Sequence, residues 1–332
     1  MRNVLITGAT GSLGGPVAEA LLARGDRVAC LVRPRPGESA QARLEAAGLA
    51  SATAIEGELG GRLGAVGKQS WDVVVHCASD RTPFPRSEGA QRRLNVDGPV
   101  ELMLAARSPT FIHVSSAWVA GARSGVALES EVDVGQAFHT STQESLLEGE
   151  VAARQHAKRE GVDLRVARPG WVIGGDECLS AFAGLVANLA WRTRHSRSQL
   201  RVPGLKGARM PLAPRAWVCA SIAALVDADA ASNSTVHLVA QGPTQDAFFA
   251  RLADRAAFPG LRVYTPRRGP LKSPTRIESQ AHALLGPMFD TLATDLVFDD
   301  REARRVLGPR GLAPLDLQGT ALLEVIDSLL ER

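Results

Sequence analysis

Short apolar runs alternate with helix-like segments along the first 240 residues of the chain. The runs, rich in valine and isoleucine, stand at Val4–Ile6, Arg27–Val32, Ala54–Glu56, Asp72–Cys77, Phe111–Val114, Arg165–Arg168 and Val236–Val239. Helix-forming stretches stand between several of them, at Val17–Ala23, Ala40–Ala47 and Val96–Ala106. Strands that are buried on both faces of a parallel sheet read as short continuous apolar runs. The order therefore predicts an α/β fold with a doubly wound parallel sheet.

The pattern loosens after Gly175. Helices are expected at Ala181–Trp191 and Val218–Asp227, and from Gln241 onward the chain reads as helices joined by proline-rich loops. We therefore predict two units, a main domain and a smaller C-terminal substrate-binding lobe. The main domain spans residues 1–175 and 215–240, and the lobe spans residues 176–214 and 241–332.

Three glycines follow the first predicted strand. Gly8, Gly11 and Gly14 form G-x-x-G-x-x-G directly before a helix. Glycines at this place permit a tight turn, close approach of the backbone to a pyrophosphate and close helix–strand packing, while the helix N-terminus attracts the phosphates. The main domain is therefore predicted to be a Rossmann dinucleotide-binding domain.

The end of the second predicted strand bears on the choice between NAD(H) and NADP(H). NAD-binding domains usually carry an acidic residue there for the ribose 2′-hydroxyl. Here the strand ends in Leu31–Val32–Arg33, with Arg35 close behind and no acid. Because a guanidinium suits a 2′-phosphate, Arg33 favours NADP(H), and NAD(H) is the less favoured alternative.

Composition narrows the possible classes of protein further. Hydrophobic residues make up 45% of the 332 residues, and the net charge is +3, which does not favour nucleic-acid binding. Arginines outnumber the four lysines heavily, a bias typical of a GC-rich bacterial genome. No apolar run approaches the ~20 residues of a membrane span, and the first strand leaves no room for a signal peptide. The four cysteines form no C-x-x-C pair, so we expect no metal site and a cytoplasmic location.

Several motifs together resemble the extended branch of the short-chain dehydrogenase/reductase superfamily, in its epimerase/dehydratase-like and thioester-reductase-like members. Thr7–Gly14 resembles the cofactor turn of that branch, and Glu58–Leu59 its adenine-flanking acid and leucine. His76–Ser79 resembles the H-x-A-A after the fourth strand, and Asn95–Gly98 the N-V-x-G at a helix start. Val114–Ala117 resembles the strand of the catalytic serine, and Arg168–Gly170 the R-P-x motif whose proline faces the nicotinamide. Phe298–Asp300 and Leu307–Gly308 resemble the C-terminal segment of this branch.

The resemblance implies a set of cofactor-binding residues, to which the arginine argument adds Arg33. They are Gly8, Thr10, Gly11, Ser12, Leu13, Gly14, Arg33, Glu58, Leu59, Cys77, Ala78, Ser79, Asn95, Val114, Pro169, Gly170, Trp171 and Val172.

The usual catalytic pair of this family is missing. The stretch from Phe138 to Glu150 resembles F-x-x-x-Y-x-x-S-K-x-E-x-E, with Thr142 at the tyrosine position and Leu146 at the lysine position. The only tyrosine, Tyr264, lies in the predicted smaller lobe. A positioned proton donor contributes about 10²–10⁴ in rate, and a threonine hydroxyl is too basic to replace an activated phenol. We therefore expect altered chemistry, or none.

Four residues are candidate replacements. Ser116 and Thr142 offer hydroxyls, and Asp80 and His139 offer groups that titrate. Each also has a purely structural alternative: a strand-end or helix hydroxyl bonded to backbone for Ser116 and Thr142, a loop cap for Asp80 and a surface side chain for His139. The nearby carboxylates, at Glu144, Glu148 and Glu150, are expected on an exposed helix face.

Substrate contacts are expected from Trp118 and Trp171, which follow strands that end at the predicted site, and from Arg192. Two cationic runs lie in the predicted lobe, at Arg192, Arg194, Arg197, Arg201, Lys206 and Arg209, and at Arg267, Arg268, Lys272 and Arg276. They are either solvated loops or a surface that steers an anionic, small-molecule substrate linked to a carrier protein or coenzyme A.

Three functions remain open at this point. The first is an NADP(H)-dependent reductase of a carbonyl or acyl-type small molecule, whose proton comes from Ser116, Thr142 or water. The second is a non-redox enzyme, such as a cyclase, dehydratase or isomerase, that uses Ser116, Asp80 and His139. The third is a non-catalytic nucleotide-binding regulator. Fold alone does not decide among them, and nothing in the pattern predicts an oligomeric state.

Overall fold

A parallel sheet of seven strands forms the centre of the main domain. The computed structural model describes residues 1–332 apart from 83–84, 86, 175–177, 196–197, 266–270 and 331–332. The strands are β1 (Asn3–Thr7), β2 (Arg27–Val32), β3 (Thr53–Glu56), β4 (Val73–His76), β5 (Thr110–Val114), β7 (Asp163–Pro169) and β11 (Thr235–Leu238). Their order is β11-β7-β5-β4-β1-β2-β3, and every pairing is parallel. The predicted doubly wound α/β fold is confirmed.

Helices cover both faces of this sheet, because successive strand residues point to opposite sides. In β1, Val4 and Ile6 join one core and Leu5 joins the other. The first core is covered by α1 (Gly14–Ala23), α2 (Ala40–Ala46), α7 (Arg215–Leu225) and α10 (Arg301–Leu307). The second is covered by α4 (Gly98–Ala106) and α5 (Ser141–Glu160), and α3 (Glu88–Arg92) precedes them. Each fully buried aliphatic side chain contributes about 1.5–3 kcal/mol.

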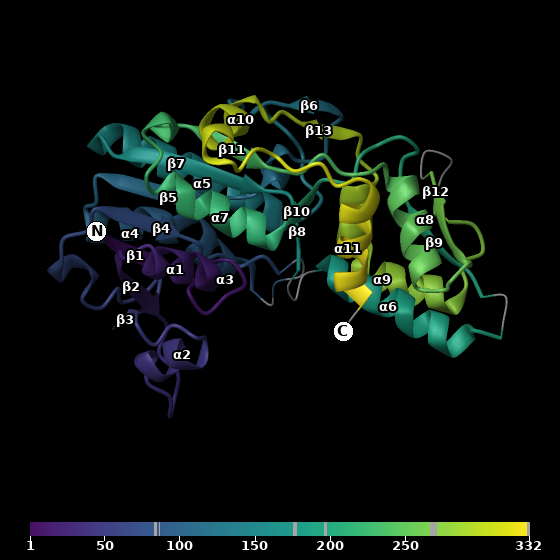
Figure 1. The fold of residues 1–332 in the computed structure, drawn as a ribbon, viewed down its shortest axis with the longest axis horizontal. Helices are drawn as coiled ribbons and strands as arrows, with labels where there is room; N and C mark the ends of the chain where they lie inside the picture. The colour runs from purple at the N-terminus through teal and green to yellow at the C-terminus, as the bar shows by residue number, and fades with distance from the viewer. Residues whose placement is uncertain (83–84, 86, 175–177, 196–197, 266–270, 331–332) are drawn as a thin grey trace.

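A separate core holds the smaller lobe, at one end of the sheet (Figure 1). It is built from α6 (Cys178–Thr193), α8 (Gln245–Arg255), α9 (Arg276–Leu292), α11 (Gly319–Leu330), β9 (Leu200–Pro203) and β12 (Leu261–Tyr264). The ring of Phe182 meets the rings of Phe249 and Phe289 edge to face at 5.8 and 5.9 Å. Among the described helices, none has the length and apolar character that crossing a membrane requires.

Several short elements were not predicted. Two small parallel ribbons pair β8 (Trp171–Ile173) with β10 (Leu212–Pro214) and β6 (Gly125–Ala127) with β13 (Leu296–Phe298). Short helical turns lie at Val66–Lys68, Ala117–Ala120, Asp229–Ala231 and Gly308–Arg310, and a π-helical segment at Arg93–Asp97. A strand of three residues is too short to show an alternating hydrophobic pattern, so only its pairing with a partner strand identifies it.

Helix α10 packs on the main sheet, although the sequence analysis assigns its residues to the smaller lobe. Its Val306 and Leu307 are buried in the core that covers β1. Glu129 fixes its N-terminus: the carboxylate accepts backbone N–H bonds from Glu302 (2.5 Å), Ala303 (3.0 Å) and His237 (2.8 Å). A carboxylate at a helix N-terminus satisfies N–H groups that lack intrahelical partners. Glu129 therefore ties α10 to β11.

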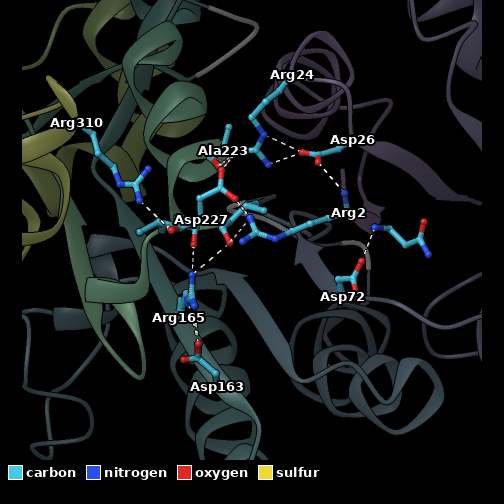
Figure 2. A network of polar contacts seen from close by, with 12 residues as sticks. Arg2, Arg24, Asp26, Asp72, Asp163, Arg165, Ala223, Asp227 and Arg310 are labelled. Atoms are coloured by element: carbon cyan, nitrogen blue, oxygen red, sulfur yellow. Dashed lines mark hydrogen bonds and ion pairs between the residues drawn. The ribbon is translucent and has the colours of Figure 1, made fainter.

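Arginines and aspartates join the amino-terminal edge of the sheet to the end of α7 (Figure 2). Arg24 ion-pairs with Asp26 and Asp227 and donates to the carbonyl of Ala223. Arg165 ion-pairs with Asp163 at 2.7 Å and donates to carbonyls at the end of α7. Guanidinium groups suit this place, since the last carbonyls of a helix lack partners and its C-terminus is negative. The network lies at the sheet edge opposite the site described below, so its role is structural.

Candidate functional site

A cavity of about 930 Å³ lies at the carboxyl ends of the sheet strands, between the main domain and α9. Ligands of open α/β folds bind at this edge. The cavity is lined by most of the residues predicted to bind cofactor or substrate: Gly8, Thr10, Gly11, Ser12, Leu13, Gly14, Arg33, Glu58, Leu59, Cys77, Ala78, Ser79, Asp80, Ser116, Trp118, Thr142, Gly170, Trp171 and Val172. Asn95, Val114, His139, Pro169 and Arg192 are not among its lining residues.

The glycine turn forms the floor of the cavity beside β1. Gly8 has φ of +72°, and a Cβ on Gly14 would lie 2.3 Å from the carbonyl oxygen of Gly8. No side chain caps the N-terminus of α1, where Leu13 occupies the capping position and no acid stands in the first turn. The first N–H groups of α1 therefore face the cavity without a capping side chain, which is the arrangement that binds dinucleotide phosphates in Rossmann folds.

Two arginines stand at the β2 end of the cavity. The guanidinium of Arg33, with 64% of its side chain exposed, lies 3.9 Å from the carboxylate of Glu58. Arg43, on α2, also lines the cavity; its side chain is buried, bonds the backbone carbonyl of Arg33 and lies 3.8 Å from Glu38. Arg43 was not predicted as a site residue, because its place beside Arg33 depends on how α2 packs.

The segment after β4 is anchored to β1. The hydroxyl of Thr7 bonds Nδ1 of His76 at 2.8 Å and accepts from the backbone N–H of Ala78 at 3.2 Å. Burial, helped by the neighbouring His113, holds the pKa of His76 well below its usual value, so this imidazole is neutral. Burial also raises the pKa of the Cys77 thiol to about 12, so Cys77 is no nucleophile. These residues shape the cavity wall.

Thr142, at the tyrosine position, is occupied by structural hydrogen bonds. Its buried hydroxyl donates to the carbonyl of Thr82 at 2.7 Å and accepts from the Gln91 side chain at 3.0 Å. The hydroxyl proton therefore holds the loop after β4. Leu146, at the lysine position, lines the cavity and packs against Val119.

Ser116 stands at the carboxyl end of β5 and lines the cavity. Its hydroxyl oxygen accepts the backbone N–H of Trp118 at 3.3 Å, which begins a short helical turn. A serine hydroxyl that accepts one bond still has its own proton to donate. Among the candidate replacements, Ser116 is thus placed to bond a substrate oxygen.

Asp80 lines the cavity, and its carboxylate accepts the backbone N–H of Thr82 at 2.9 Å. Its backbone is held by Asn95, which accepts from the Asp80 N–H at 2.8 Å and donates to its carbonyl at 2.9 Å. Asn95 belongs to the π-helical segment and also bonds Ser145 at 2.9 Å. Asn95 therefore positions the loop and does not face the cavity.

The other predicted site residues lie away from the cavity lining. His139 precedes α5, and burial lowers its pKa, while its backbone N–H bonds Gln143 at 3.0 Å. Val114 and Pro169 are buried in their strands, and Arg192 is exposed at the end of α6. In the cationic runs, Arg201 pairs with the buried Glu278 at 2.7 Å, and Arg197, Arg267 and Arg268 lie outside the described residues.

The end of the cavity near the smaller lobe is aromatic and apolar. The rings of Trp118 and Trp171 lie 5.2 Å apart, and Phe298 meets Trp118 edge to face at 5.6 Å. Met288 and Thr291, both on α9, complete this wall, and Gln143 donates to the Thr291 hydroxyl at 3.2 Å. These contacts of α9 were not predicted, because helix periodicity does not tell which helix closes a pocket.

The predicted exposure of Glu150 is wrong. Its carboxylate is fully buried and pairs with Arg168 at 2.6 Å and Arg154 at 2.7 Å. Although burial alone would raise it, these two guanidinium groups lower the pKa of Glu150 to about 2. Glu150 follows Leu146 by four residues and so shares its buried helix face.

Among the described residues, no cluster of side chains suits a metal ion.

Comparison with known proteins agrees with this architecture. The chain belongs to the NAD dependent epimerase/dehydratase family, whose model matches residues 4–203. No curated protein sequence matches significantly.

Solved structures share the fold at low sequence identity. The terminal R domain from the myxalamid PKS-NRPS biosynthetic pathway is 22% identical, with a TM-score of 0.76, over 99% of this chain and 90% of that one. UDP-glucuronic acid 4-epimerase from Bacillus cereus, in complex with NAD, is 15% identical with a TM-score of 0.69, over 98% of both chains. DesIV, a dTDP-glucose 4,6-dehydratase from Streptomyces venezuelae with NAD bound, is 17% identical with a TM-score of 0.68, over 99% of this chain and 97% of that one.

Proposed function

We propose that this protein is an NADP(H)-dependent reductase of a carbonyl or acyl-type small molecule, with a proton donor other than the family's tyrosine. One observation carries the proposal: a single cavity joins Arg33 and Arg43, the glycine turn, Ser116 and the aromatic wall of Trp171. A dinucleotide and a small substrate need such a continuous space, with phosphate sites at one end and a substrate group at the other.

The preference for NADP(H) rests on the paired arginines. Arg33 and Arg43 both line the cavity beside β2, and guanidinium groups bind phosphate by charge-assisted, bidentate bonds. Glu58 lies 3.9 Å from Arg33 at the same end of the cavity, and both side chains are more than half exposed, so the guanidinium remains open to a ligand. The epimerase and dehydratase structures named above hold NAD, which favours the other cofactor, so the choice needs a direct test.

The residues fit reduction of a carbonyl without the tyrosine. When bound, a reduced nicotinamide supplies the hydride that reaches the carbonyl carbon. The Ser116 hydroxyl donates to the carbonyl oxygen, and a solvent proton completes the alcohol. Thr142 takes no part in this transfer, since its proton is committed to Thr82. With an aldehyde the product is the alcohol; with an acyl thioester the same hydride and proton give a hemithioacetal, which releases the thiol and leaves an aldehyde. Without a lysine-activated phenol the reaction favours substrates whose carbonyl is already electrophilic, such as aldehydes.

The substrate we propose has an apolar acyl part. Trp118, Trp171, Leu146 and Met288 line its end of the cavity. The likeness to a terminal R domain supports a substrate linked to a carrier protein or coenzyme A, as does the exposed Arg192 near the smaller lobe's surface.

Binding measurements test the cofactor. Trp118 and Trp171 line the cavity, so their fluorescence reports on a bound nucleotide. We expect NADPH to quench it at micromolar concentration and more strongly than NADH. Stronger quenching by NADH, or none by either nucleotide, contradicts the proposal.

Single-turnover measurements test the reaction. Enzyme charged with NADPH is mixed with aldehydes and acyl thioesters, and the loss of reduced-nicotinamide absorbance is followed. Ser116→Ala should slow this loss by about 10²-fold or more, whereas Ser130→Ala, at an exposed serine outside the cavity, should not. An unchanged rate in Ser116→Ala removes the catalytic assignment.

A non-redox activity is the second candidate. It is favoured by the carboxylate of Asp80, which lines the same cavity as Ser116 while the usual redox pair is missing. In that case product forms with the redox state of the nicotinamide unchanged, and Asp80→Asn abolishes it.

A further inference from the structure

The cavity that has Leu146 at the lysine position also has an arginine in its lining. Arg81 follows β4 by five residues and lines the cavity together with Leu146 and Ser116. Its Nε donates to the Ser79 hydroxyl at 2.9 Å, and one Nη donates to the carbonyl oxygens of Ser115 at 2.8 Å and Val114 at 3.4 Å. The guanidinium therefore reaches from the end of β4 to the end of β5.

The loop that carries Arg81 is fixed on both sides. Asn95 holds the backbone of Asp80 with two hydrogen bonds, and Gln91 donates to the carbonyl of Thr82 at 3.1 Å. Thr142 donates to that same carbonyl at 2.7 Å. A binding group whose neighbours are held in this way loses little conformational entropy when a ligand arrives. Thr142, at the tyrosine position, thus supports the loop that carries Arg81.

The positive charge of Arg81 shifts the pKa values of two buried groups near the carboxyl edge of the sheet. Burial sets the pKa of Cys77 at about 12 and that of His113 at about 4; the charge of Arg81 opposes the first shift and adds to the second. The charge of Arg81 thus acts on Cys77, directly after β4, and on His113 in β5. The other cavity arginines, Arg33 and Arg43, lie at the β2 end, so cations stand at both ends of the proposed dinucleotide site.

We propose that Arg81 binds the nicotinamide-ribose half of the dinucleotide, in place of the lysine that Leu146 replaces. The guanidinium would donate to hydroxyl oxygens of that ribose, beside Ser116, since it already bonds the carbonyl of Ser115. An arginine cannot release a proton at ordinary pH, so it takes over the binding task of the lysine and not its acid–base task. This inference rests on the proposed binding of NADP(H).

Comparing a whole cofactor with its fragment tests this assignment. The probes are NADPH and adenosine 2′,5′-bisphosphate, which lacks the nicotinamide half, and calorimetry measures both dissociation constants. Arg81→Met should weaken NADPH about tenfold, or about 1.4 kcal/mol, and leave the bisphosphate within about twofold. Arg81→Lys should retain most of the NADPH affinity, because it keeps the charge. Arg251→Met, at an exposed arginine on α8, should change neither constant.

A second variant distinguishes the loss of a cation in Arg81→Met from a defect in folding. In the Arg81→Met background, Leu146→Lys should restore much of the NADPH affinity, since it returns a cation to the same end of the cavity. Equal weakening of both probes by Arg81→Met, or weakening of neither, overturns the assignment of Arg81. If the wild-type protein binds neither probe, the proposed function fails as well, so the two failures are distinguishable.

Discussion

Replacing Gly14 with alanine should damage the phosphate turn. The new Cβ would lie 2.3 Å from the Gly8 oxygen, about 1 Å short of ordinary contact. Both partners are backbone, so α1 must move away from β1. Overpacking of this kind costs about 1–3 kcal/mol of stability. Loss of one charge-assisted bond to a phosphate weakens NADPH by about tenfold or more.

The assay is thermal unfolding and NADPH calorimetry on Gly14→Ala and on a matched control. The control is Gly184→Ala in α6, where a Cβ would meet nothing within 4 Å. Alanine in a helix gains about 0.5–1 kcal/mol over glycine, so this control should be slightly more stable and bind NADPH normally. Wild-type stability and NADPH affinity in Gly14→Ala would show that the turn accommodates a Cβ at this position, contrary to this prediction.

Three further predictions concern stability. Glu150→Gln should cost about 3–5 kcal/mol in chemical denaturation, because Arg168 stays buried beside a neutral partner, whereas Glu160→Gln on the surface should cost little. Acid should destabilise the fold: His113 and His237 have pKa values of about 4, so the stability present above pH ~6.5 is lost toward pH 4, and that of Glu150 is lost from pH ~4.5 toward 2. Glu129, whose pKa burial raises to about 7, offsets part of this loss above pH ~4.5. An unfolding free energy that rises from pH 7 to 4 would contradict the buried neutral histidines. Thr142→Val should cost about 1 kcal/mol and weaken NADPH by no more than about threefold, because Gln91 still holds the Thr82 carbonyl, and a loss as large as that of Arg81→Met would contradict its structural role.

The sheet could be predicted from sequence because its strands are buried on both faces. Val73–Val75 is apolar throughout, and the glycine turn marks the first crossover, so the parallel sheet and the edge that carries the site could be predicted, whereas the order of the strands was not. The ribbon of β6 and β13 could not be predicted, since three-residue strands are defined by a partner far along the chain.

The candidate site was partly predictable for a related reason. Gly8 and Ser116 stand at fixed places in strand–turn patterns, so their neighbourhood follows from the fold. Arg43 reaches the cavity through helix packing, and Arg81 through loop hydrogen bonds; no local sequence pattern predicts either arrangement. Glu150 was misjudged because its charge suggested exposure, although its spacing from Leu146 places it on the buried face.

A crystal structure with saturating NADPH would show directly whether the cofactor binds as proposed. We expect the pyrophosphate on the backbone amides from Gly11 to Gly14, the 2′-phosphate between Arg33 and Arg43, and the nicotinamide ribose within hydrogen-bond distance of Arg81. A nucleotide bound elsewhere, or a glycine turn that excludes the pyrophosphate, would contradict it.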